Sequence, residues 1–310
     1  MAVTHVILGA GAIGSSVARQ LAESGESDDV VRVLTRSGSG PALAGVELVA
    51  VDAADTEAFV AASAGATRLY NCANPAYHRW PQDWPPIAAS LLAAAREHEA
   101  VLATVSNLYG YGPVDGELTE DLPLATQGSK GEVRAGMWRD ALAEHEAGRI
   151  RATEVRGSDY IGDGVQGHLA DRVLKPLVAG KAVRVLGSAD EPHTWTYRDD
   201  MARMLITAAG DERAWGQVWH VPSNPPKTQR EVILDYAQAL GLAEPKVRTV
   251  PGWLIRVSGM FVPMMRELRE TEYQFDRPFV MNSEAAQQTF GLAPTPWPEI
   301  VDDAVRSYRS

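Results

Sequence analysis

Three glycines near the start of the chain have the spacing of a phosphate-binding turn. Gly9, Gly11 and Gly14 follow an apolar run that is typical of a buried parallel strand, and a helical pattern follows them. The first glycine permits a tight turn, the second lets a pyrophosphate approach the backbone, and the third lets the helix pack closely on the strand. The N–H groups and dipole of that helix attract phosphate. The pattern therefore predicts a dinucleotide site that includes Ala12 and Ile13.

Thr35 and Arg36, at the end of the second expected strand, bear on which dinucleotide fits. An acidic residue there would hydrogen-bond the adenosine ribose of NAD, whereas a basic residue accepts the extra phosphate of NADP. No acidic residue adjoins Arg36 in the sequence, so we expect NADP, with NAD as the other possibility. The alternative is that Arg36 is a solvated surface side chain.

Residues after the next two expected strands could also line the cofactor. Asp52, followed by Ala53, could accept a hydrogen bond from the adenine amino group. Ala73 and Asn74 follow the fourth strand and are small enough to lie against the dinucleotide. We therefore include all four residues among the expected cofactor contacts.

A serine and two tyrosines follow the fifth expected strand, at residues 101–105. Open α/β sheets bind their ligands at this carboxyl end of the strands. Ser106 and Asn107, followed by Tyr109 and Tyr111, are therefore candidates for contact with a bound ligand. The alternative for the two tyrosines is packing within a turn.

Two tryptophans lie in a segment, residues 77–86, whose three prolines predict a loop. Trp80 and Trp84 could form a wall of the substrate cleft or could cover the core, and both possibilities remain open. Tyr160 and Trp195 are two further, weaker candidates for substrate contact.

Composition excludes several classes of protein. A net charge of −11 over 310 residues argues against nucleic acid as a main partner. The single cysteine, Cys72, rules out an intramolecular disulfide, is expected in the core and suits the cytoplasm. No apolar run is long enough to span a bilayer, so no membrane contact is expected. The seven histidines are scattered without metal-ligand spacing, so no metal site is expected.

These residues need a frame of alternating strands and helices. The alternation over residues 1–160 predicts an α/β fold with a doubly wound parallel sheet, a Rossmann domain. Residues 161–310 are expected to form mostly a smaller α+β lobe for substrate, with residues 195–222 returning to the Rossmann domain. Within that lobe a capping box, Thr228 to Glu231, predicts a helix start, and residues 253–272 are expected to be helical.

The chain resembles the extended or atypical short-chain dehydrogenase/reductase superfamily, of the NAD-dependent epimerase/dehydratase type, over nearly its whole length. Besides the glycine turn, the resemblance is carried by residues 71–73, 106–110, 156–162, 197–202 and 216–222. It implies that Ser106 is the catalytic serine and that Lys130 is the catalytic lysine, which also holds the nicotinamide ribose.

Two departures from that family stand out. The glycine turn is one residue shorter than usual, and the catalytic tyrosine expected four residues before Lys130 is replaced by Thr126. In the family this tyrosine exchanges a proton with the reacting oxygen, and the lysine lowers its pKa. A threonine hydroxyl is far too weak an acid for this role. Tyr109 is the nearest candidate to replace it; otherwise the chemistry needs no phenol, or the protein is not catalytic.

Three functions follow from these observations. The first is an NADP-dependent oxidoreductase that transfers hydride to or from a small, fairly apolar carbonyl or alkene. The first alternative is a nucleotide-sugar epimerase or dehydratase, and the second is a non-catalytic NADP-binding or sensor protein. A diphosphate substrate would need basic residues in the second lobe, where the sequence offers four: Arg172, Lys175, Lys181 and Arg184.

The resemblance also implies a homodimer. Helices expected at residues 87–99 and 129–147 correspond to those that pair as a four-helix bundle in the family. Charged residues on the second helix, such as Arg139, Glu144 and Glu146, weigh against this pairing.

Overall fold

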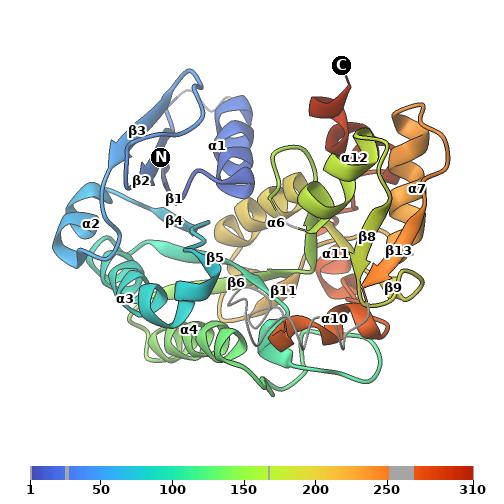
Figure 1. Cartoon of the computed structure of the whole chain (residues 1–310). Helices are drawn as coiled ribbons and strands as arrows, with labels where there is room; N and C mark the ends of the chain where they lie inside the picture. The colour runs from blue at the N-terminus through green and yellow to red at the C-terminus, as the bar shows by residue number, and fades with distance from the viewer. Residues whose placement is uncertain (1, 25–27, 167, 251–268, 310) are drawn as a thin grey trace.

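The computed structural model describes residues 2–24, 28–166, 168–250 and 269–309. Within these ranges the centre of the molecule is a seven-stranded parallel sheet of order β11-β6-β5-β4-β1-β2-β3 (Figure 1). Its strands are β1 (Thr4–Leu8), β2 (Val30–Thr35), β3 (Val46–Ala50), β4 (Arg68–Asn71), β5 (Val101–Asn107), β6 (Arg151–Gly157) and β11 (Val218–His220). The order runs outward from β1 on one side and from β4 on the other, which confirms the predicted doubly wound α/β fold.

Two layers of helices cover the sheet. One face carries α1 (Ala12–Ser24) and α6 (Arg198–Gly210), and the other carries α2 (Thr56–Ala62), α3 (Trp80–Glu97) and α4 (Ser129–Glu146) (Figure 1). Along β1, Ile7 packs in the same core as α1 and α6, whereas Val6 and Leu8 pack in the core shared with α3 and α4. Burial on both faces explains why β1 is apolar from Val6 to Leu8.

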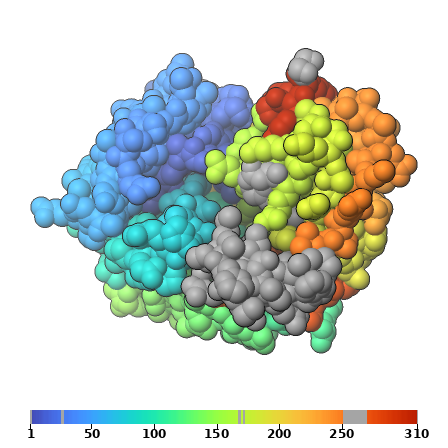
Figure 2. All heavy atoms as spheres, in the orientation of Figure 1, coloured from blue at the N-terminus to red at the C-terminus, as the bar shows by residue number. Residues whose placement is uncertain are grey.

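A smaller lobe is built on short strand pairs and has its own apolar core. In Figure 2 it is coloured mainly yellow to red and lies opposite the blue N-terminal part. The predicted capping box is present, because Thr228 and Glu231 each accept a backbone hydrogen bond from the other. The elements of the smaller lobe are β7 (Asp159–Ile161), η3 (His168–Leu174), α5 (Lys175–Val178), β8 (Val183–Leu186), β9 (Pro192–His193), β10 (Trp195–Tyr197), β12 (Lys227–Thr228), α7 (Gln229–Ala239), β13 (Val247–Val250), α10 (Tyr273–Asp276) and α12 (Trp297–Ala304). The helix α11 (Glu284–Phe290) instead packs on β11 in the core of the large sheet.

The segment of the two tryptophans is helical, so the loop predicted there is wrong. A 3-10 turn, η1 (Tyr77–Arg79), leads directly into α3 at Trp80. Pro81 fits because the first turn of a helix has N–H groups without helical partners. Pro85 and Pro86 leave two carbonyls unbonded four residues earlier, but those carbonyls belong to exposed residues and can be solvated.

Two further expectations concern the rest of the chain. Most of the helical stretch expected at residues 253–272 lies outside the described residues. Among the helices that the structure does describe, none combines the length and the apolar character that crossing a bilayer requires.

Candidate active site

The glycine turn between β1 and α1 has a backbone that other residues could not adopt. Gly9 has φ of +98°, and a Cβ there would lie 2.8 Å from the carbonyl oxygen of Cys72. A Cβ on Gly14 would lie 2.0 Å from the carbonyl oxygen of Gly9. Gly11, by contrast, is exposed and a Cβ there would meet nothing within 4 Å. The turn is therefore tight on the sheet side and open where a pyrophosphate would approach the start of α1, at Ala12.

The residues predicted around this turn differ in accessibility, and Ala53 is buried at 6% exposure. Arg36 is exposed just beyond β2, and its charge reaches the carboxylate of Asp83 on α3. Asp52 is exposed after β3, where one of its oxygens accepts a hydrogen bond from the Ala54 amide at 3.0 Å. Cys72 is buried, as predicted, and burial raises the pKa of its thiol. Arg36 and Asp52 are therefore accessible to a ligand bound beside the turn.

Ser106, at the carboxyl end of β5, is 3% exposed, and within the described residues its hydroxyl has no hydrogen-bond partner. Its carbonyl accepts a hydrogen bond from the Tyr160 phenol at 3.1 Å. Asn107 points its side-chain oxygen at the Tyr109 amide, 3.1 Å away, and so shapes the next turn, η2 (Tyr109–Tyr111). A buried hydroxyl without a partner is costly unless a ligand or water completes it. Ser106 is therefore suited to contact a bound group.

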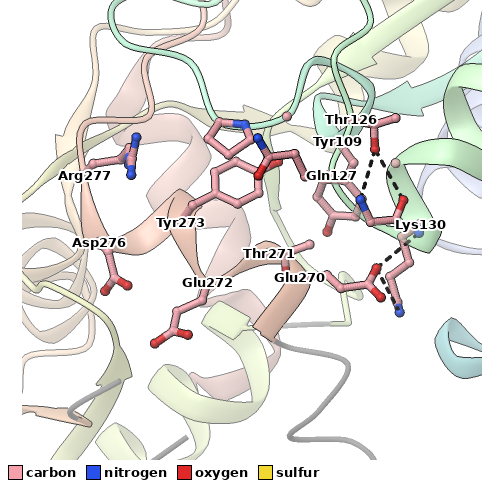
Figure 3. Close-up of a pocket in the computed structure, with 14 residues that line it drawn as sticks. Tyr109, Thr126, Gln127, Lys130, Glu270, Thr271, Glu272, Tyr273, Asp276 and Arg277 are labelled. Atoms are coloured by element: carbon pink, nitrogen blue, oxygen red, sulfur yellow. Dashed lines mark hydrogen bonds and ion pairs between the residues drawn. The ribbon is translucent and has the colours of Figure 1, made fainter. Parts of the chain in front are cut away.

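Lys130 lies in the first turn of α4 and is 1% exposed (Figure 3). Its Nζ is 3.8 Å from Oε2 of Glu270, and that same oxygen accepts a hydrogen bond from the Lys130 backbone amide. The ammonium group also stands 4.5 Å from the centroid of the Tyr77 ring. Lys130 is thus a buried cation placed against a carboxylate on one side and a phenol ring on the other.

Tyr77 is a residue that the sequence analysis missed. It lies six residues after the end of β4, and its phenol is hydrogen-bonded to Tyr109 and Thr271. Burial raises the pKa of Tyr77, and burial followed by the nearby Tyr77 and Asp159 raises the pKa of Tyr109 well above its usual value. The available signal was its position, since it follows Ala73 and Asn74 at the carboxyl edge of the sheet.

A pocket of about 330 Å³ opens beside Lys130 (Figure 3). Thr126 lies on its wall, and its hydroxyl is hydrogen-bonded to the carbonyl of Gly128 at 3.3 Å. The Thr126 hydroxyl would overlap a Cβ at Gly131, which explains the glycine at that position. The other labelled side chains around the pocket are Tyr109, Gln127, Lys130, Glu270, Thr271, Glu272, Tyr273, Asp276 and Arg277.

Tyr111 lies away from this pocket, inside the core. Its phenol is 2.8 Å from Nε2 of His220, whose Nδ1 is 2.7 Å from the carbonyl oxygen of Asn282. A carbonyl can only accept, so Nδ1 carries the proton and Nε2 accepts from Tyr111. Burial lowers the pKa of His220 to about 3, so the ring is neutral. The guanidinium of Arg156 covers the Tyr111 ring at 4.6 Å. These contacts make Tyr111 a structural residue.

The three tryptophans predicted as substrate contacts are buried. Trp80 and Trp84 are 2% and 0% exposed, and they enclose the guanidinium of Arg134 at 4.5 and 4.6 Å from their rings. Trp195 packs on His193, 4.4 Å between ring centroids. The structure thus places these side chains in the core, and Trp80 reaches the site through its contact with Tyr109 at 6.2 Å.

Tyr160 contacts both the site and a polar pair behind it. The carboxylate of its neighbour Asp159 is 2.9 Å from Nε2 of the buried His193. Burial raises the pKa of Tyr160, and the charge of Asp159 raises it further. Among the described residues no group of three or more His, Cys, Asp or Glu side chains could hold a metal ion. The candidate site therefore consists of Ser106, Lys130 and a set of phenols.

Solved structures with the same fold are numerous. The dTDP-glucose 4,6-dehydratase of Bacillus anthracis in complex with NAD superposes with a TM-score of 0.80 at 18% identity, over 99% of this chain and 96% of that one. The dTDP-glucose 4,6-dehydratase of Streptomyces venezuelae, with NAD and TYD bound, has a TM-score of 0.80 at 19% identity, over 99% and 97%. The UDP-glucuronic acid 4-epimerase of Bacillus cereus, with UDP-glucuronic acid and NAD, has 0.78 at 15%, over 98% of each chain.

Identities this low establish the fold alone. No curated protein matches the sequence. The model of the NAD dependent epimerase/dehydratase family matches residues 5–221, which is more than half of the chain and runs from β1 through β11. The matched region contains the glycine turn, Ser106 and Lys130. The chain therefore belongs to the NAD dependent epimerase/dehydratase family.

Proposed function

We propose that the protein is an enzyme that transfers hydride between a nicotinamide dinucleotide and a substrate carbon that carries oxygen. The observation that carries this proposal is the buried Lys130 beside the Tyr77 and Tyr109 phenols, at the sheet edge that also bears Ser106. A lysine on a solvated face would instead support a binding protein. The bound cofactor would supply or accept the hydride.

The chain's own residues have separate tasks in this proposal. The unpartnered Ser106 hydroxyl orients the reacting oxygen, and a phenol of the Tyr77–Tyr109 pair exchanges its proton. Tyr109 is the phenol that the sequence favours for this step. Lys130 stabilises the phenolate and, through its match to the family's lysine, holds the nicotinamide ribose. Gly9, Gly11 and Gly14 hold the pyrophosphate.

Two substrate classes fit this chemistry. The structural neighbours are named for nucleotide sugars, and that support favours this class over the small, apolar carbonyl or alkene expected from the sequence. None of the four basic residues named from the sequence lines the described pocket, but Lys130 and Arg277 do. Carboxylates from Glu270, Glu272 and Asp276 also line it and can accept hydrogen bonds from sugar hydroxyls, while Arg277 offers a cation to a phosphate.

For the cofactor we favour NADP, because Arg36 is exposed where the extra phosphate would lie. NAD remains the alternative, and the neighbours named above were solved with NAD.

We also propose a homodimer through α3 and α4, which lie side by side on one face of the sheet (Figure 1). A monomeric mass in light scattering at micromolar concentration would contradict the dimer.

The test is isotope transfer. The protein is incubated with stereospecifically deuterated NADPH or NADH and a panel of small aldehydes, ketones and enones. In parallel, it receives NAD or NADP with dTDP- and UDP-sugars deuterated at the carbon to be oxidised, and products are analysed by mass spectrometry. Label transfer that depends on Lys130 supports the proposal. Tight NADPH binding with no transfer in any reaction would instead establish a non-catalytic binding protein.

A further inference from the structure

The position left without a tyrosine at Thr126 raises the question of which phenol serves the reacting oxygen. Two phenols lie beside Lys130, and they are hydrogen-bonded to each other, Tyr77 in η1 and Tyr109 in η2. They differ in their contact with the cation and in the direction of hydrogen bonding, and both differences point to the same residue.

The first difference is the contact with Lys130. Its Nζ stands over the face of the Tyr77 ring, 4.5 Å from the centroid. A cation at this distance interacts favourably with a neutral ring, and more so with a phenolate, whose charge spreads into the ring. The Tyr77 ring is itself held edge-on by Trp80, at 5.1 Å and 66°. Tyr77 is therefore both oriented and placed next to a fixed positive charge.

The second difference is the direction of the hydrogen bonds. Burial raises the pKa of Tyr77, but the hydrogen bonds from Thr271 and Tyr109 to its oxygen oppose that rise. For Tyr109 the bond to Tyr77 acts in the other direction and raises the pKa further, after burial and the charges of Tyr77 and Asp159. A donor to the Tyr77 oxygen would stabilise a phenolate on the ring that also faces the Lys130 ammonium group at 4.5 Å, so both contacts favour Tyr77 as the phenol that ionises.

The remaining charges around the pair keep the phenols protonated at rest. Asp159 and Glu270 both raise the pKa of Tyr77 after the effects of burial and hydrogen bonding. The Arg134 guanidinium, enclosed by Trp80 and Trp84, acts on both phenols in the opposite direction. A phenol that is neutral at rest but has two hydrogen-bond donors and a cation ready for its anion suits a general acid.

We propose that Tyr77 is the proton-transferring phenol of this enzyme, in place of the tyrosine missing at position 126, and that Tyr109 is a positioning residue that donates a hydrogen bond to it. This inference rests on the proposed function. In the reduction of a carbonyl, the carbon receives hydride and the oxygen takes the Tyr77 proton, which leaves an alcohol and a Tyr77 phenolate. The phenolate is held by the donors Tyr109 and Thr271 and by Lys130, and it regains a proton from water. In the oxidative direction the same phenolate accepts the proton of the alcohol.

The experiment compares Tyr77→Phe and Tyr109→Phe, with Tyr308→Phe in the C-terminal 3-10 turn as a control for loss of a phenol elsewhere. Both site variants keep the ring and its packing, so the fold should survive. On the best substrate from the isotope panel, Tyr77→Phe should lower kcat by about 10²- to 10⁴-fold and leave the Kd for NADPH unchanged. Tyr109→Phe should lower kcat less, by about 10-fold, and should move the alkaline limb of the pH profile upward, because it removes a donor to the phenolate. Full turnover in Tyr77→Phe together with a large loss in Tyr109→Phe would overturn the assignment.

A second measurement needs no substrate. Tyrosinate absorbance is titrated in both variants, each of which keeps one phenol of the coupled pair. We expect the Tyr77 phenol that remains in Tyr109→Phe, which faces Lys130, to ionise at lower pH than the Tyr109 phenol that remains in Tyr77→Phe; the reverse order would overturn the proposal. A wild type that transfers no label to any substrate would refute the proposed function, and the titration would still decide which phenol ionises first.

Discussion

The glycine turn and the phenol pocket lie at the same edge of the sheet, yet they are built in different ways. The turn is made by one continuous stretch, and its shape depends on backbone contacts such as that between Gly9 and the Cys72 carbonyl. The pocket is lined by η2, the segment that leads into α4, the start of α4 and residues 270–277, and Tyr77 of η1 adjoins it through its contact with Lys130. The glycine turn depends on one local stretch, so its shape can persist when a substitution in the dispersed pocket changes which side chain transfers the proton.

The largest effect should come from filling the glycine turn. Gly14→Ala places a methyl group 2.0 Å from the Gly9 carbonyl oxygen, so β1 and α1 must separate. We expect a loss of about 3 kcal/mol or more in the free energy of unfolding and loss of measurable NADPH binding. Denaturant titration and calorimetry measure the two effects. Gly11→Ala is the matched control, since its methyl group meets open space and should leave stability unchanged while hindering only the dinucleotide.

The phenol pocket should respond to the loss of its cation without loss of the fold. Lys130→Met keeps much of the aliphatic volume but removes the charge beside Tyr77 and Glu270. We expect kcat to fall by about 10²- to 10⁴-fold and the Kd for the dinucleotide to rise, because one residue serves both. The exposed Lys181 gives the control substitution to Met. Unchanged turnover in Lys130→Met would show that the pocket is not the catalytic end.

The same contrast explains what the sequence could predict. The alternation of strands and helices, the glycine turn and the Thr228 capping box depend on neighbours in the chain, and the structure has all of them. The helix through Pro85 and Pro86 was missed because exposure of the unbonded carbonyls is a tertiary property. Tyr77 was missed for a related reason, since its contact with Lys130 joins residues 53 positions apart, and no local pattern marks it.

A smaller effect is expected at the adenosine end of the turn. Arg36→Ala removes an exposed charge that no part of the core depends on, so the fold should be unaffected. If Arg36 binds the extra phosphate of NADP, the Kd for NADPH should rise by about 10- to 100-fold and the Kd for NADH should stay the same. Titration calorimetry with both dinucleotides measures this, with Arg213→Ala as an exposed control. Equal weakening for both would remove the assignment to NADP.

The smallest effect on turnover should come from Tyr111, a structural phenol that lies apart from the Tyr77–Tyr109 pair. Tyr111→Phe removes the donor to Nε2 of His220 and leaves that nitrogen buried without a partner. We expect the free energy of unfolding to fall by about 1–3 kcal/mol while kcat stays unchanged.

The buried His220 also makes stability depend on pH. Since burial holds the pKa of His220 at about 3, below its ordinary value of 6.5, the unfolded chain takes up this proton first as the pH falls. The neutral ring therefore contributes stability above pH 6.5, and that contribution is lost between pH 6.5 and about 3. The loss is at most about 1.4 kcal/mol per pH unit. His220→Asn should lack this part of the slope when unfolding is measured from about pH 7 to pH 5, and a slope equal to that of the wild type would contradict the neutral, buried histidine.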